Sequence, residues 1–130
     1  PGASHFIKEV RKNKSIAVCF ATGSLRRPAI QKLQSIGVKF DDQLLVASDR
    51  LLKRESIVKK AIADAKAFYQ VDSFERIIAI GDGPWDLKVA QNLGLEFVGI
   101  GLKNKERLIE NGCAKHFDDF TTISPVQLLD

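Results

Sequence analysis

The sequence of 130 residues has few cysteines, and no apolar run approaches the roughly 18 residues that suggest a membrane span. Its two cysteines, Cys19 and Cys113, lie far apart and outside any CxxC or Cys/His metal spacing. Neither a disulfide framework nor a zinc site is therefore indicated. The first residues, PGASHFIKEVRKNK, do not have the pattern of a signal peptide. We expect a cytoplasmic protein with reduced thiols and no membrane partner.

Aromatic residues are also scarce, at 8%, and the 20 lysines and arginines that outnumber 16 acidic residues are spread along the chain. Nucleic-acid-binding surfaces usually need a basic strip that carries aromatic side chains, so we expect no nucleic-acid partner. The hydrophobic (45%) and charged (28%) fractions are those of ordinary globular proteins. The length suits one domain over residues 1–130 with a real hydrophobic core.

Apolar strand patterns alternate with amphipathic helix patterns along the chain. Strands are expected at 16–21, 44–47, 76–80, 95–100 and 115–117. Helices are expected at 4–12, 28–36, 57–68, 87–93 and 103–111, and from Pro125 with Ser124 as its N-cap. Because the connections are long enough for crossovers, the pattern predicts an α/β fold with a largely parallel sheet.

Ligands of open parallel sheets bind beyond the carboxyl ends of the strands, so the residues after each strand are candidates for a site. Thr22, Gly23 and Ser24 follow the first strand. They offer hydroxyls and a small backbone whose N–H groups can approach a phosphate closely. The alternative is a simple turn.

A second candidate is Gly81-Asp82-Gly83-Pro84-Trp85-Asp86, which follows the apolar strand 76–80. If a helix begins at Pro84, the carboxylates of Asp82 and Asp86 can converge, and hard oxygen ligands suit Mg²⁺. The alternative is that both carboxylates only cap and line a helix N-terminus. For Trp85 we expect a packing role.

A third candidate is Lys53, which lies just before the helix expected at 57–68. A lysine there can reach back over the strand ends toward an anion. Taken alone, a solvated surface lysine is the alternative interpretation.

The combination of Thr22, Lys53 and GDGPWDLKVAQNLG, in this order and at these separations, resembles the second, third and fourth motifs of the haloacid dehalogenase-like hydrolases. The likeness runs through most of the chain and is strongest to capped phosphatases of the phosphoglycolate phosphatase type. It implies a doubly wound, Rossmann-like core. It also implies that Thr22 binds the transferred phosphoryl group, that Lys53 neutralises charge, and that Asp82 helps to hold Mg²⁺ with support from Asp86.

The chain departs from that family in one essential motif. The family's DxDx[TV] sequence supplies the nucleophilic aspartate, and no D-x-D occurs here. The adjacent pairs Asp41-Asp42 and Asp118-Asp119 fit surface turns better. Pro1-Gly2 resembles the point where the family's chain re-enters the core after its inserted cap. The resemblance therefore implies a partial core domain without its first strand and cap, whose sheet another segment or another chain must fill.

Two functions follow from these observations. The first is a Mg²⁺-dependent phosphatase that hydrolyses a small phosphorylated metabolite through an aspartyl-phosphate, with the nucleophile absent from this chain, so that the chain alone is inactive. The second is a catalytically silent phosphate-binding or protein-interaction domain derived from such an enzyme. We favour the first because Thr22, Lys53, Asp82 and Asp86 are all chemically intact.

Overall fold

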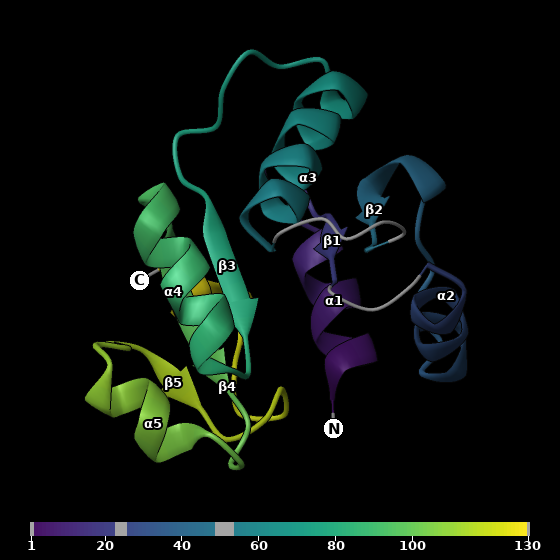
Figure 1. Ribbon diagram of the computed structural model, residues 1–130. Helices are drawn as coiled ribbons and strands as arrows, with labels where there is room; N and C mark the ends of the chain where they lie inside the picture. Colours follow the sequence, from purple (N-terminus) through teal and green to yellow (C-terminus); the bar gives the residue numbers. More distant parts are fainter. Residues whose placement is uncertain (1, 23–25, 49–53, 130) are drawn as a thin grey trace. The chain divides into compact units, whose positions relative to one another are not determined.

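The computed structural model describes residues 2–22, 26–48 and 54–129. These residues divide into two compact units, one formed by 2–9 with 75–129 and the other by 10–74. Within the described ranges the chain is a mixed α/β protein with two small parallel sheets and six α-helices (Figure 1). None of the helices described is both long and apolar enough to cross a membrane. A single domain over 1–130 stays a prediction.

The unit 10–74 contains a two-stranded parallel sheet covered by a long helix. Its elements are β1 (Phe20–Ala21), α2 (Arg26–Ser35), the 3₁₀ helix η1 (Asp42–Leu44), β2 (Leu45–Val46) and α3 (Arg54–Tyr69). Phe20 pairs with Leu45, and Ala21 with Val46. The sheet is buried against α3 through a cluster of Val46, Ile57 and Ala61, with Cys19 packed beside it. Apolar residues at three-to-four spacing on α3 therefore face the sheet.

The unit 2–9 with 75–129 contains a three-stranded parallel sheet in the order β3-β4-β5. Its elements are β3 (Ile78–Gly81), α4 (Pro84–Leu93), β4 (Glu96–Ile100), α5 (Lys105–Glu110), β5 (His116–Phe117) and α6 (Pro125–Leu129), and α1 (Ala3–Arg11) lies mostly in this unit. Leu87, Leu108 and Cys113 form its main buried cluster, with Phe97 packed against it. The parallel pairing predicted from the long connections is thus confirmed in both sheets.

Helix ends follow the sequence signals closely in the second of these units. α4 begins at Pro84, and it ends at Gly94, whose φ of 70° lies in the left-handed region that glycine adopts without strain. α6 begins after Ser124, whose hydroxyl accepts a hydrogen bond from the N–H of Gln127 at 3.4 Å, while the Gln127 side chain accepts from the N–H of Ser124 at 2.8 Å. This reciprocal pair is a capping box.

The first predicted strand is much shorter than expected. The apolar pattern predicts a strand over 16–21, but of these residues Phe20 and Ala21 alone pair with a neighbouring strand in the described part of the chain. The hydroxyl of Tyr69 accepts a hydrogen bond from the Val18 N–H at 3.3 Å and lies 3.4 Å from the Val18 carbonyl oxygen. A side chain of α3 thus takes the place of a strand partner at Val18, because backbone polar groups need partners whether or not a ladder supplies them.

Candidate functional site

The carboxyl end of β1 leads directly into Thr22. The Thr22 N–H donates to the Val46 carbonyl at 3.0 Å and so continues the β1–β2 ladder by one bond. Thr22 itself is half-buried. The other predicted residues of this part of the site, Gly23, Ser24 and Lys53, lie outside the described residues. The structure therefore tests neither the phosphate loop nor the lysine.

The carboxyl end of β3 leads into the loop Gly81–Asp86, which opens α4. Asp82 is exposed, and within the described ranges its carboxylate forms no hydrogen bond or ion pair. Its backbone carbonyl, in contrast, accepts a hydrogen bond from the side-chain amide of Asn104 at 3.1 Å. The loop thus holds the main chain of Asp82 and leaves its charged group available to a ligand.

Asp86 lies in the same loop but has a different role. Its Oδ2 accepts a hydrogen bond from the Gly83 N–H at 3.2 Å, and its own N–H donates to the Gly83 carbonyl at 3.0 Å. A Cβ built on Gly81 would lie 2.7 Å from the same Oδ2, so the carboxylate is folded over the backbone of the loop. The capping alternative is therefore realised for Asp86 but not for Asp82.

The indole of Trp85 covers the same loop from outside. A Cβ on Gly83 would lie 2.2 Å from Cε2 of Trp85, so only glycine leaves room for the ring. Trp85 nevertheless keeps 43% of its surface exposed. It thus packs against Gly83 on one side and faces solvent elsewhere, and its expected packing role stays a prediction.

Two further residues lie next to Asp82, and the sequence pattern predicts neither of them as part of a site. Asn104 reaches Asp82 from the loop after β4, and Gly101 in that loop has a φ of +95°, with room for a Cβ 3.9 Å from that of Asp82. The residue after Asn104, Lys105, forms a 3.0 Å ion pair with Asp118 after β5. Polar residues between a strand and a helix carry no spacing signal. Only the β3–β4 register, which sets Gly81 opposite Gly99, brings them together.

The donor set of the loop fits Mg²⁺. Mg²⁺ usually takes one or two carboxylates and completes its octahedron with water and substrate phosphate oxygens. Asp82 offers one carboxylate without a described partner, and the Asp86 carboxylate lies against the same loop. The described residues contain no group of three or more His, Cys, Asp or Glu side chains suited to a metal ion. The loop thus offers the exposed Asp82 carboxylate as one oxygen ligand for a cation.

The interpretation of the two adjacent aspartate pairs as surface turns is confirmed. The Asp41 carboxylate accepts from the Gln43 N–H at 2.9 Å and caps η1. The Asp119 carboxylate accepts from the N–H of Thr121 at 2.8 Å and from its hydroxyl. The hydroxyl bond, together with this N–H bond, holds the pKa of Asp119 below its usual range. Both pairs are thus engaged in local turn geometry.

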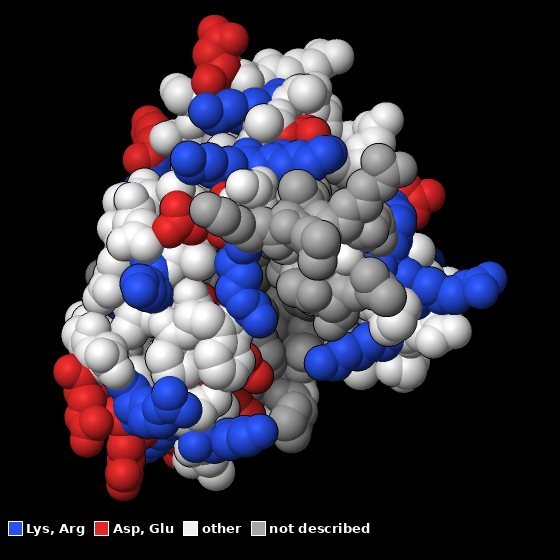
Figure 2. Space-filling model, viewed as in Figure 1, with Lys and Arg blue, Asp and Glu red and all other residues white. Residues whose placement is uncertain are grey.

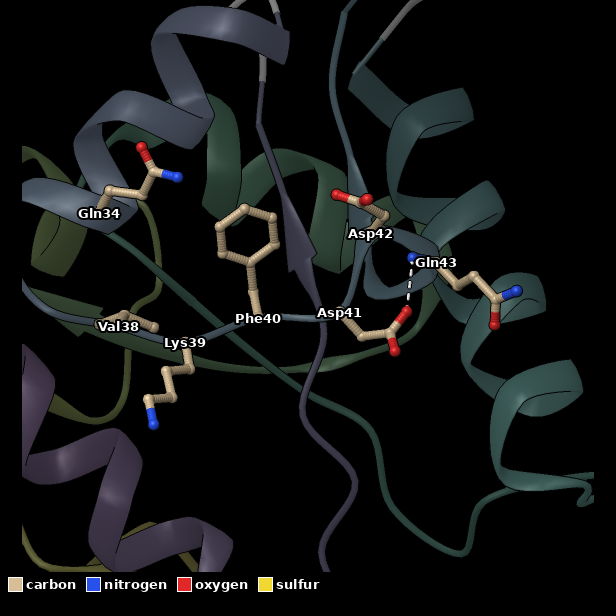
Figure 3. A pocket seen from close by; sticks show the side chains of 7 residues that line it. All are labelled: Gln34, Val38, Lys39, Phe40, Asp41, Asp42 and Gln43. Atoms are coloured by element: carbon tan, nitrogen blue, oxygen red, sulfur yellow. Dashed lines mark hydrogen bonds between the residues drawn. The ribbon is translucent and has the colours of Figure 1, made fainter.

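An open hollow of about 820 Å³ lies in the unit 10–74, between α2 and η1 (Figure 3). Its lining consists of Gln34, Val38, Lys39, Phe40, Asp41, Asp42 and Gln43. Of the predicted site residues that the structure describes, Thr22, Asp82 and Asp86, none lines it. The Asp41 carboxylate caps η1, and the Asp42 carboxylate forms a 3.3 Å ion pair with Arg26. Both carboxylates in the lining therefore already have partners within the protein.

Lys and Arg side chains do not gather in one patch on the face drawn in Figure 2. Within the described residues visible there, they lie in several separate places with acidic side chains between them. This distribution agrees with the spread of charge along the sequence.

Comparison with known proteins gives no match, either to a protein-family model or to a curated protein sequence.

Proposed function

We propose that this chain is part of the core of a Mg²⁺-dependent phosphohydrolase of the haloacid dehalogenase-like type, acting on a small phosphorylated metabolite. One observation carries the proposal. The sequence GDGPWD follows an apolar parallel strand and opens α4, and Asp82 keeps a carboxylate free of described partners beyond the strand end. Such strand ends are where ligands bind in open parallel sheets.

In this proposal each predicted residue acts on one part of a phosphate ester. Thr22, Gly23 and Ser24 donate hydrogen bonds to the phosphoryl oxygens, and the ammonium of Lys53 stabilises their negative charge. Asp82 holds the cation, while Asp86 keeps the loop in shape through Gly83. When bound, Mg²⁺ supplies further positive charge to the phosphoryl oxygens.

The nucleophile has to come from another polypeptide segment, because the chain has no D-x-D. In the proposed doubly wound core that segment forms a strand between β1 and β3. The Ile77 carbonyl accepts from the Glu96 N–H at 3.1 Å and therefore faces β4. Since backbone groups alternate along a strand, those of Ile78 and Ile80 face the opposite edge of β3. An apolar strand added there would find ladder partners.

The missing motif also favours the second candidate, a silent phosphate-binding or protein-interaction domain. Such a domain needs Thr22 and Lys53 for an anion but has no need of a carboxylate on a cation. The two functions therefore differ in whether Asp82 is required.

The decisive experiment uses the complete polypeptide encoded by the gene. If it carries DxDx[TV], we expect Mg²⁺-dependent hydrolysis of small phosphate monoesters, abolished by Asp82→Asn and strongly reduced by Lys53→Ala. Asp72→Asn, at another exposed aspartate, is the matched control and should keep full activity. A complete polypeptide that binds phosphate without hydrolysing any ester, and tolerates Asp82→Asn, would support the silent domain instead.

A further inference from the structure

The loop after β4 makes one side-chain hydrogen bond to the loop after β3. Asn104 lies 22 residues after Asp82 and donates from Nδ2 to the Asp82 carbonyl at 3.1 Å. The identity of the donor atom follows from chemistry, because a carbonyl only accepts and the amide nitrogen is the only donor on an asparagine side chain. The bond therefore ties the Asp82–Gly83 peptide to the β4–α5 connection.

This bond holds the carbonyl of Asp82, whose carboxylate has no partner among the described residues. Gly83, the next residue, is fixed by Asp86 and covered by Trp85. The Asp82 carboxylate is exposed, so its direction depends on the orientation of its own peptide. A hydrogen bond to the Asp82 carbonyl oxygen limits rotation of that peptide about the Cα–C bond, and so it fixes the direction in which the Asp82 side chain leaves the backbone.

We propose that Asn104 is a positioning residue that orients Asp82 toward the cation. The proposal rests on the proposed function, in which Asp82 holds Mg²⁺. Partners that orient a metal ligand without touching the metal change its affinity by roughly 10- to 100-fold when they are removed. Asn104 is half-buried and comes from a different loop, so it can hold the Asp82 backbone while the exposed carboxylate stays available to a cation.

The test measures Mn²⁺ binding to the 130-residue chain from the electron paramagnetic resonance signal of free Mn²⁺, with Mg²⁺ as competitor. Asn104→Ala and the nearly isosteric Asn104→Leu should each weaken Mn²⁺ binding by about tenfold, and Asp82→Asn should abolish it. Asn111→Ala is the matched control, because Asn111 donates the same kind of bond to the Arg107 carbonyl at 2.6 Å on α5. It should leave Mn²⁺ affinity unchanged.

The failure of this inference and that of the proposed function give different results. If the unmodified chain binds Mn²⁺ through Asp82 but both Asn104 variants bind equally well, the positioning role is wrong and the cation site stands. If the unmodified chain binds no Mn²⁺, or Asp82→Asn binds as well as it does, the cation site and the inference fall together. A loss equal in Asn111→Ala and Asn104→Ala would point to general destabilisation and would also overturn the positioning role.

Discussion

The carboxylate of Asp86 accepts a hydrogen bond from the N–H of Gly83 at 3.2 Å, and the N–H of Asp86 returns one to the Gly83 carbonyl at 3.0 Å. This reciprocal pair closes the first turn of α4. Asp82, four residues earlier, makes no such bond with its carboxylate to any described residue. The two carboxylates of this short motif therefore differ in their contacts. That of Asp86 stabilises the loop, and that of Asp82 faces solvent.

We predict that Asp86→Ala destabilises the fold by about 1 kcal/mol, the usual cost of losing a helix cap. Asp82→Ala should change the free energy of unfolding by less than about 0.5 kcal/mol, because an exposed side chain without a partner contributes little. Urea unfolding of the two variants measures both values. Equal losses would mean that Asp82 has a structural role that its exposed position hides.

Leu108 has no exposed surface and packs with Leu87 and Cys113, whereas its neighbour Ile109 is 51% exposed. Leu108→Ala should destabilise the fold by about 2–5 kcal/mol through lost burial and a cavity. Ile109→Ala should cost less than about 0.5 kcal/mol. Chemical denaturation measures the free energy of unfolding of both variants. Each variant is the control for the other, because both remove a branched aliphatic side chain from α5 and the two positions differ in burial. A similar cost for both would contradict the assigned face of the helix.

Burial raises the pKa of the Cys19 thiol, and the nearby carboxylate of Asp64 raises it further. Alkylation of Cys19 should therefore have its pH midpoint above the ordinary thiol value of about 8.5. The native fold favours the neutral thiol. The stability of the fold that comes from Cys19 is therefore fully present below the pKa of this thiol in the unfolded chain. It is lost as the pH rises through the higher pKa of the thiol in the folded protein.

Iodoacetamide labelling followed by peptide mass spectrometry measures that midpoint directly. Asp64→Asn should lower it, because the negative charge beside the thiol is removed. A midpoint that stays at the ordinary value in the unmodified chain would show that Cys19 is more open to solvent than its packing against α3 implies.

Arg76, which lies just before β3, donates two hydrogen bonds, of 2.8 and 2.6 Å, to the carboxylate of Glu96 at the start of β4. The hydrogen bonding to Arg76 lowers the pKa of Glu96. The pair should thus add stability above the ordinary glutamate pKa of about 4.3, and this stability should disappear as pH falls through the lowered value. Because both side chains are largely exposed, we expect less than about 1 kcal/mol.

Urea unfolding of Glu96→Gln and of the unmodified chain over a series of falling pH values isolates this contribution. The variant should be less stable than the unmodified chain at pH 7, and the difference should shrink as the pH falls below the ordinary glutamate pKa of about 4.3. A difference that does not change with pH would have to come from something other than the charge of Glu96.

We predict that the 130-residue chain alone hydrolyses no phosphate ester, since its residues can bind and polarise a phosphoryl group but supply no D-x-D nucleophile. The measurement is release of phosphate from an aryl phosphate at saturating Mg²⁺. Turnover that disappears when Mg²⁺ is chelated and in Asp82→Asn would contradict it, and would require a nucleophile elsewhere in the chain.

Much of the local structure follows from the sequence alone. Pro84 and Gly94 mark the ends of α4, and Ser124 with Gln127 marks the start of α6, because helix ends depend on neighbouring residues only. The parallel direction of the strands follows from the length of their connections. The position of Asp82 directly after an apolar strand can likewise be predicted from the sequence.

Tertiary structure decided the features that depend on residues far apart in the chain. The strand predicted over 16–21 shrinks to Phe20–Ala21, since Tyr69 of α3 binds the backbone of Val18, and no local pattern reports that meeting. Asn104 reaches Asp82 only because of the β3–β4 register. Composition and spacing record which groups a chain carries, but hydrogen bonds between distant segments form only when the packed sheet brings their atoms within about 3 Å.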